Sequence, residues 1–231
     1  DATAFVLRLG RAFHALGYNG AISVQFGKWT ALPHGSSTPQ KLKDGDIVMI
    51  DDGVSCEGYQ SDITRTTVFG TPTQRQKDVW EVEKRAQTAA FEAIRIGATC
   101  ESVDAAARKV IEGAGFGPGY KVPGLPHRTG HGMGLDGHEW TNFVKGNTTP
   151  IAAGMCFSDE PMIAIPGEFG IRLEDCVYIA EDGAHFFTKQ SVAIDFRAPG
   201  GAFVLRYAQL KVTDAAGSEI FARMEGFVEL G

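Results

Sequence analysis

Residues 46–68 read DIVMIDDGVSCEGYQSDITRTTV, in which Asp51 ends one apolar run and Asp62 opens a β-branched run. The turn-forming Gly53 and Gly58 lie between the two runs, so two antiparallel strands are predicted, with the aspartates side by side. Burying an unpaired carboxylate is energetically costly, so we expect a cation close to both side chains.

A second ribbon repeats this plan with glutamates. The segments Met155–Glu160 and Ile171–Val177 read MCFSDE and IRLEDCV, and two prolines and a glycine between them predict a turn. Glu160 and Glu174 thus add two carboxylates, and His131, between the two ribbons, adds an imidazole. One cation does not need four carboxylates, whereas two divalent ions about 3.5–4 Å apart do. Hard oxygen donors with one imidazole therefore predict a hydrolytic metal centre.

Length and composition are those of one large domain with a sizeable core. The chain has 231 residues, of which 43% are hydrophobic and 22% charged, with a formal net charge of −6. This charge argues against a nucleic-acid partner. We find no apolar run long enough for a membrane span and no export signal in the sequence, so no membrane partner and a cytoplasmic location are expected. The spacing of the four cysteines favours free thiols.

Apolar residues recur at helical spacing in three segments, at about residues 2–16, 74–96 and 101–112. Gly97 and the glycine-rich run 113–119 are expected to end the second and third helices. The order of ribbon, helices and ribbon predicts an α+β fold, in which an antiparallel sheet carries helices on one face.

Five motifs in this order resemble the methionine aminopeptidase and prolidase family. They are IDDG at 50–53, SDITRT at 61–66, HRTGHGMGLDGHE at 127–139, DEP at 159–161 and GIRLED at 170–175. The resemblance covers most of residues 1–195 and implies the pita-bread fold, whose two pseudo-symmetric halves hold a dinuclear metal site between them. Five ordered motifs are far more specific than any single short pattern.

The resemblance implies two divalent metal ions, with manganese expected first and cobalt, zinc or iron as alternatives. Asp51 and Asp62 would hold one ion, and Asp62, His131 and Glu160 the other, with Glu174 bridging them. A metal-bridging hydroxide would attack the peptide bond, and Glu160 would take the proton of the water that forms it.

Three further histidines and one arginine match family positions that are not ligands. His34 and His138 are expected to contact the substrate, and His138 also to stabilise the oxyanion. His127 and Arg172 resemble the Xaa-Pro peptidases and prolidases rather than the methionine aminopeptidases, and Arg172 is expected to bind substrate. The predicted catalytic residues are therefore Glu160, His34, His127 and His138.

Both ends of the chain depart from the family pattern. The family's first helix is not found before residues 2–16, whereas the sequence near the C-terminus resembles it. We hypothesise a circular permutation, and the alternative is an ordinary C-terminal extension helix. The predicted organisation is a single metallopeptidase domain over 1–231, with a core at 1–195, a linker at 196–202 and a helix at 203–231.

Two other features differ from the closest branch of the family. Asp52 occupies a position that is usually apolar, so we do not assign it as a ligand. The N-terminal domain that helps to close the site and form the oligomer in Xaa-Pro peptidases is not found in this sequence. Preference for dipeptides or longer peptides therefore stays open.

Together these features predict a dinuclear metal-dependent exopeptidase that hydrolyses the N-terminal bond of Xaa-Pro peptides or dipeptides. A methionine aminopeptidase is the alternative enzyme. An inactive peptide-binding module on the same fold is the alternative from another class. The predicted partners are short peptides with proline in the second position, and a homodimer is a further candidate.

Overall fold

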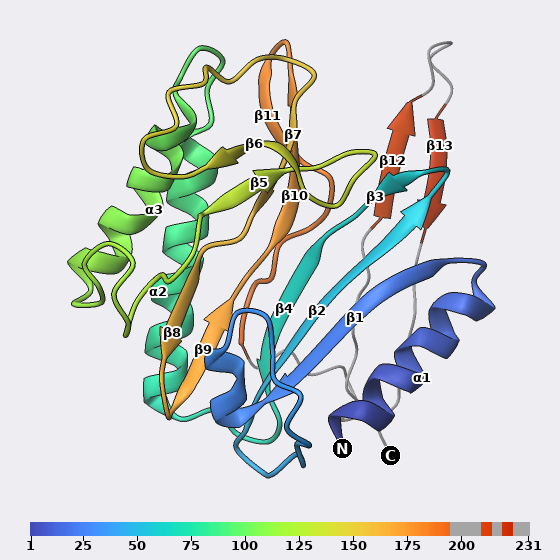
Figure 1. Cartoon of the computed structure of the whole chain (residues 1–231), viewed down its shortest axis with the longest axis vertical. Coiled ribbons are helices and arrows are strands. Elements are labelled where there is room, and N and C mark those ends of the chain that lie inside the picture. The colour runs from blue at the N-terminus through green and yellow to red at the C-terminus, as the bar shows by residue number, and fades with distance from the viewer. Residues whose placement is uncertain (195–208, 214–218, 224–231) are drawn as a thin grey trace.

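The computed structural model describes residues 1–194, 209–213 and 219–223 (Figure 1). Its helices are α1 (Ala2–Ala15), η1, a 3-10 helix (Gly27–Ala31), α2 (Gln74–Ala93) and α3 (Cys100–Gly113). Its strands are β1 (Asn19–Phe26), β2 (Ile47–Cys56), β3 (Tyr59–Gln60), β4 (Ile63–Val68), β5 (Gly130–Gly132), β6 (Glu139–Phe143), β7 (Cys156–Asp159), β8 (Met162–Ile165), β9 (Phe169–Arg172), β10 (Asp175–Ala180), β11 (Gly183–Phe186), β12 (Gln209–Thr213) and β13 (Glu219–Arg223). The mixture of helices and antiparallel sheets confirms the predicted α+β class.

The first ribbon forms as expected from its sequence. Strand β2 pairs with β1, β3 and β4, all antiparallel, and its register places Asp51 opposite Thr64. Successive residues of a strand point to opposite faces. Val48 and Ile50 accordingly pack in the cluster that holds Leu9 of α1, whereas Met49 belongs to the main core. Asp51, on the same face as Met49, therefore points toward the second half of the molecule.

The second ribbon differs in detail from the prediction. The strand expected over Ile171–Val177 is divided at Leu173 and Glu174 into β9 and β10. Strand β9 pairs with β8 in a separate hairpin, and both strands are apolar and buried. Strand β10 pairs instead with β7, in a five-stranded sheet. At the break, the Glu174 N–H donates to Thr64 O of β4 at 3.2 Å. Glu174 therefore lies where the two ribbons meet.

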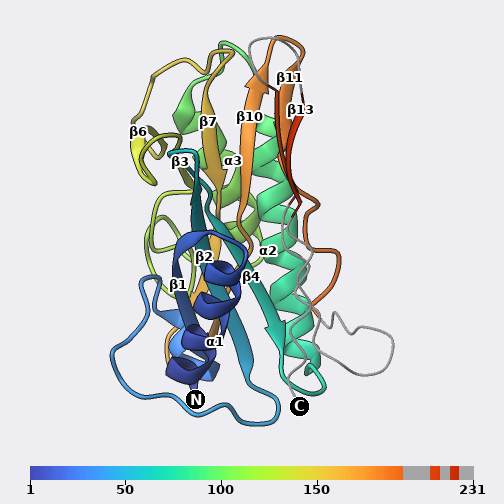
Figure 2. The same cartoon turned by 90° about the vertical axis from the view of Figure 1, so that its right-hand side faces the viewer.

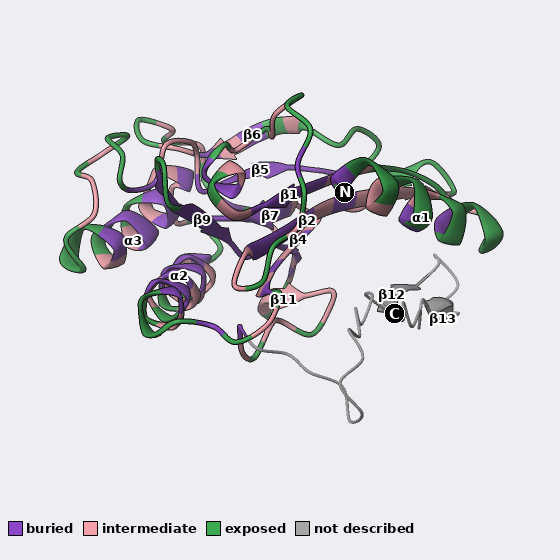
Figure 3. Ribbon diagram, turned by 90° about the horizontal axis from the view of Figure 1, so that it is seen from below, coloured by how far each residue is buried: buried purple, intermediate pink, exposed green. Residues whose placement is uncertain are grey.

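Helices α2 and α3 form where they were predicted (Figure 2). Helix α2 packs against β7, β8 and β9 of the second ribbon, and α3 packs against α2 and β6. Thr73 and Gln76 make a capping box that starts α2, which is the expected device at a helix N-terminus. Figure 3 shows the buried strands between α1 on one side and α2 with α3 on the other. None of the helices in the described ranges is long and apolar enough to cross a bilayer. The four cysteines are free, as expected.

The predicted helix over residues 203–231 is wrong where the structure describes that segment. Residues 209–213 and 219–223 form the antiparallel pair β12 and β13 instead. The sequence QLKVT alternates polar and apolar residues and includes β-branched ones, a pattern that favours a strand over a helix. The linker at 196–202 lies outside the described residues, and the circular permutation stays a prediction.

Candidate metal centre

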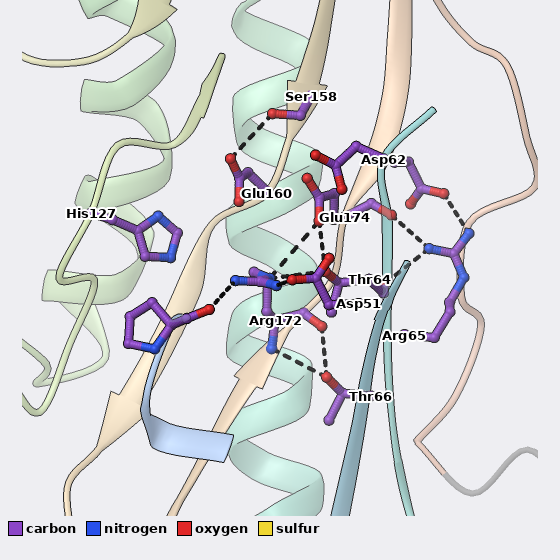
Figure 4. A network of polar contacts seen from close by, with 12 residues as sticks. Asp51, Asp62, Thr64, Arg65, Thr66, His127, Ser158, Glu160, Arg172 and Glu174 are labelled. Carbon is purple, nitrogen blue, oxygen red and sulfur yellow. Dashed lines mark hydrogen bonds and ion pairs between the residues drawn. The ribbon is translucent and has the colours of Figure 1, made fainter. Parts of the chain in front are cut away.

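The five predicted ligand side chains meet where the two ribbons face each other. Oxygen atoms of Asp51, Asp62 and Glu174 all lie within 4.8 Å of one another, as do donor atoms of His131, Glu160 and Glu174. Figure 4 shows the four carboxylates pointing toward one another. Because Glu174 belongs to both groups, its position fits the bridging role expected for it.

The backbone of Asp62 is held by a thiol from the other ribbon. Its N–H donates to Cys176 Sγ at 3.4 Å, and the Cys176 thiol donates to Asp62 O at 3.1 Å. Cys176 is the second residue of β10 and lies two positions after Glu174, so these contacts keep the two carboxylates together. Burial raises the pKa of the Cys176 thiol, which is therefore present as a neutral donor.

His131 presents one ring nitrogen to the carboxylates. Its side chain is 1% exposed, and Nε2 lies 3.5 Å from Asp62 Oδ2 and 3.3 Å from Glu160 Oε1. The other nitrogen, Nδ1, lies 3.0 Å from Gly132 O, which can only accept. In the tautomer that satisfies this carbonyl, Nε2 keeps its lone pair and can coordinate a metal.

The electrostatics of the site favour bound cations. Burial, followed by the charges of Asp62 and Glu160, raises the pKa of Glu174 well above its ordinary value. Burial likewise raises the pKa of Glu160 and of Asp51, and Arg172 only partly offsets these effects. One buried guanidinium does not balance four converging carboxylates. The donor set of four carboxylates and one imidazole therefore fits divalent ions.

Arg172 lies beneath this cluster and is 4% exposed. Its Nε donates to Thr64 Oγ1 at 2.9 Å, one terminal nitrogen donates to Pro33 O at 3.0 Å, and the other pairs with Asp51 Oδ2. These contacts orient Asp51 and join it to the loop that precedes His34. The substrate contact expected of Arg172 stays a prediction.

Of the three other predicted histidines, His138 lies directly against the cluster. The His138 ring stacks edge-on against His131 with centroids 4.3 Å apart, and a His138 nitrogen lies within 4.8 Å of donor atoms of Asp62 and His131. Burial, followed by the charge of Arg172 for His127 and of His131 for His138, lowers the pKa of both rings, and the charge of His34 contributes less to the same effect. Their catalytic and substrate-binding roles stay predictions.

His127 is the most constrained of these histidines. Burial, followed by the charge of Arg172, lowers its pKa to about 3, so the ring is neutral at physiological pH. Its Nδ1 lies 2.6 Å from Arg128 O, whereas its buried Nε2 has no protein partner among the described residues. Because a carbonyl only accepts, Nδ1 carries the proton and Nε2 is free to accept a hydrogen bond.

Two residues of the first ribbon support Glu174, and the sequence analysis missed both. Thr64 Oγ1 donates to Glu174 Oε2 at 2.6 Å, and an Arg65 terminal nitrogen donates to Glu174 O at 2.7 Å. Arg65 also pairs with Asp175 at 2.5 Å. Their signal was the SDITRT motif, where a buried strand carries hydroxyls and an arginine beside a ligand.

Asp52 is in none of the ligand groups found among the described residues. Strand alternation turns its side chain to the face opposite that of Asp51. In the strand register Asp52 lies opposite Ile22 of β1 and Ile63 of β4. Burial, followed by the charge of Asp51, raises its pKa to about 7. This placement agrees with leaving Asp52 out of the predicted ligands.

Two carboxylates outside the cluster are buried without partners. Glu83 of α2 and Asp159 of β7 are both 0% exposed, and among the described residues their oxygens accept no hydrogen bond. Burial, followed by the charge of Asp159, raises the pKa of Glu83 well above 4.5. The unfolded chain therefore releases this proton at a lower pH than the folded chain, so stability decreases as pH rises above about 4.5.

Replacing Glu83 with glutamine is expected to increase the free energy of unfolding by about 1–3 kcal/mol at pH 8, because no charge is then buried. At pH 5 the increase should be much smaller, since folded Glu83 is already protonated. Urea unfolding at both pH values measures this difference, with the exposed Glu92→Gln on the same helix as the control. An equal increase in the free energy of unfolding at both pH values would contradict the charge state assigned to Glu83.

Comparisons with known proteins match both the sequence and the fold of this chain. The model of metallopeptidase family M24 matches residues 3–181. An Xaa-Pro dipeptidase of Lactobacillus helveticus is 43% identical over 165 residues, which are 71% of this chain and 44% of that protein. The chain thus spans less than half the length of this relative.

Solved structures share the same architecture. The prolidase from Pyrococcus furiosus matches with a TM-score of 0.77 and 34% identity, over 83% of this chain and 56% of that one. A methionine aminopeptidase from Rickettsia prowazekii matches with a TM-score of 0.71 and 20% identity, over 80% of this chain and 84% of that one. The second likeness concerns the fold alone, which is the predicted pita-bread fold.

Proposed function

Because the chain belongs to metallopeptidase family M24, we propose that it forms the catalytic part of a metal-dependent Xaa-Pro peptidase. The observation that carries this proposal is the convergence of all five predicted donors, with Glu174 common to two groups. The 43% identity to an Xaa-Pro dipeptidase supports the choice of substrate class. We further propose that the predicted core, residues 1–195, acts as one catalytic domain.

In this proposal Asp51 and Asp62 would hold one divalent ion, His131 and Glu160 would hold the other together with Asp62, and Glu174 would be shared by both. Bound divalent ions supply a nucleophile at neutral pH by lowering the pKa of a water, and they polarise the scissile carbonyl. Manganese is the ion proposed first. The same donor set also accepts cobalt, zinc or iron, and the availability of each metal decides among them.

Glu160 is proposed to accept the proton of the attacking water. It is 9% exposed, follows β7 directly, and accepts a hydrogen bond from Ser158 at 3.3 Å, which fixes the carboxylate. Burial raises the pKa of Glu160 from its ordinary value, and a higher pKa makes a carboxylate a better proton acceptor.

The histidines are proposed to bind and orient the peptide. His127 offers the neutral acceptor Nε2, which suits an N–H donor of the substrate. His138 is exposed beside His131 and can donate to the oxyanion that develops on the carbonyl. Neither role requires a nucleophilic side chain.

The function is tested with chain that has been stripped of metal with a chelator and then reloaded with manganese, cobalt or zinc. We expect metal-dependent cleavage of Ala-Pro, with kcat/KM at least about tenfold above that for Met-Ala, equivalent to about 1.4 kcal/mol. The stripped protein is the control. Faster cleavage of Met-Ala would indicate a methionine aminopeptidase. Peptide binding without cleavage by the reloaded protein would indicate a binding module.

A further inference from the structure

A buried ion pair lies on the inner face of α3, away from the proposed ligands. Arg108 Nε donates to Asp104 Oδ2 at 2.8 Å, with side chains 9% and 2% exposed. Because desolvation offsets most of the attraction, a buried pair is seldom more stable than apolar residues of similar size. Stability alone is therefore a weak reason for these two charges in the core.

The other hydrogen bonds that Arg108 donates all go to one irregular segment, the connection between α3 and β5. One terminal nitrogen donates to Gly119 O at 2.7 Å and Leu125 O at 3.0 Å, and the other donates to His127 O at 2.6 Å. The guanidinium also stacks on Tyr120 at 4.2 Å. A planar guanidinium has enough donors for this task, whereas an ammonium does not have the same fork.

Asp104 extends the same unit toward Glu160. Its second oxygen accepts from Thr129 Oγ1 at 2.8 Å, and Thr129 is fully buried. The Thr129 carbonyl in turn accepts a hydrogen bond from the Glu160 N–H at 2.8 Å. The Thr129 N–H donates to Phe143 O at 2.9 Å. One ion pair thus connects the backbones of His127 and Glu160, which belong to different strand connections.

We propose that Asp104 and Arg108 are positioning residues that hold His127 and, through Thr129, Glu160 at a constant separation. This inference rests on the proposed peptidase function, in which both residues face the substrate. The ion pair contacts neither the His127 ring nor the Glu160 carboxylate, and it acts through their backbones. A misplacement of about 1 Å in such groups can lower a rate about 10²-fold.

Two substitutions test the proposal. Thr129→Val removes the hydroxyl that links Asp104 to the Glu160 loop, and Arg108→Lys keeps the charge but removes the fork. Each is expected to lower kcat on Ala-Pro by about 10²-fold with smaller changes in KM and in bound metal. Thr129→Ser, which restores the hydroxyl, and Arg75→Lys, which alters an exposed pair with Glu168, should stay near wild type.

A readout independent of activity accompanies the kinetics. Hydrogen exchange of the Glu160 amide should accelerate at least about tenfold in Thr129→Val and stay near wild type in Thr129→Ser. If folded Thr129→Val had the same kcat and the same amide exchange rate as wild type, the proposal would be overturned. It would also be overturned if the Ser and Val variants lost kcat to the same extent. If wild type cleaves no Xaa-Pro peptide, the proposed function fails. The exchange rates then still decide whether the ion pair positions Glu160.

Discussion

Glutamine in place of Glu174 should lower kcat/KM for an Xaa-Pro dipeptide by about 10³-fold or more. Several kcal/mol of transition-state stabilisation depend on the metals, and each 1.36 kcal/mol is worth a factor of about ten. Glu174 is the carboxylate shared by the group that holds Asp51 and Asp62 and the group that holds His131 and Glu160, so its replacement by an amide should weaken the binding of both proposed ions at once. The amide also leaves Thr64 Oγ1, 2.6 Å from Oε2, without a charged acceptor.

Steady-state kinetics together with metal analysis of the purified protein measure this effect. We expect less bound metal per chain than in wild type under equal loading. Glu168→Gln is the matched control, because Glu168 is exposed and pairs with Arg75 outside the cluster. Full metal content and wild-type kcat/KM in Glu174→Gln would show that Glu174 is not a ligand.

A glutamine at position 160 should lower kcat by about 10²–10⁴-fold, the range typical of a lost general base. Its effect on metal content should be smaller than that of Glu174→Gln, because Glu160 belongs to only one of the donor groups found among the described residues. The contrast separates proton transfer from metal binding. A lost ligand lowers metal and rate together, whereas a lost base lowers the rate with metal retained.

Comparison at saturating metal makes this second experiment decisive. Glu160→Gln and wild type are loaded with the same ion, and kcat is measured only after equal metal content has been verified. Ser158→Ala, which removes the hydrogen bond to Glu160 at 3.3 Å, should cause a much smaller loss. Wild-type kcat in fully loaded Glu160→Gln would rule out the proposed proton acceptor.

Local patterns were sufficient for much of the fold. The β-branched runs around Asp51 and Asp62 and the helical spacing in 74–96 correspond to β2, β4 and α2. Local patterns failed at two places. Residues 209–213 and 219–223 form an antiparallel pair of strands, although the wider segment resembled a helix, and only the first of the two alternates polar and apolar residues. Ile171–Val177 is interrupted at Glu174 because β8 and β9 pair with each other.

The supporting contacts of the site were largely beyond prediction. Thr64 and Glu174 are 110 positions apart, and Asp62 and Cys176 are 114 apart. Nothing in a local pattern indicates which hydroxyl or thiol faces a ligand across two ribbons. The carbonyl partners of Arg108 had no sequence signal either, because they are backbone groups of an irregular segment.

The sequence by itself determined the chemistry of the candidate site. Four carboxylates and one imidazole in order along the chain are hard donors, whose preference for divalent ions does not depend on the fold. Only the tertiary structure decided which donor atoms lie close enough to bind the same ion, that Glu174 belongs to two such groups, and that Arg172 holds Asp51. Donor type is a property of each side chain, whereas the distances between donors depend on strand register and on the packing of the two ribbons.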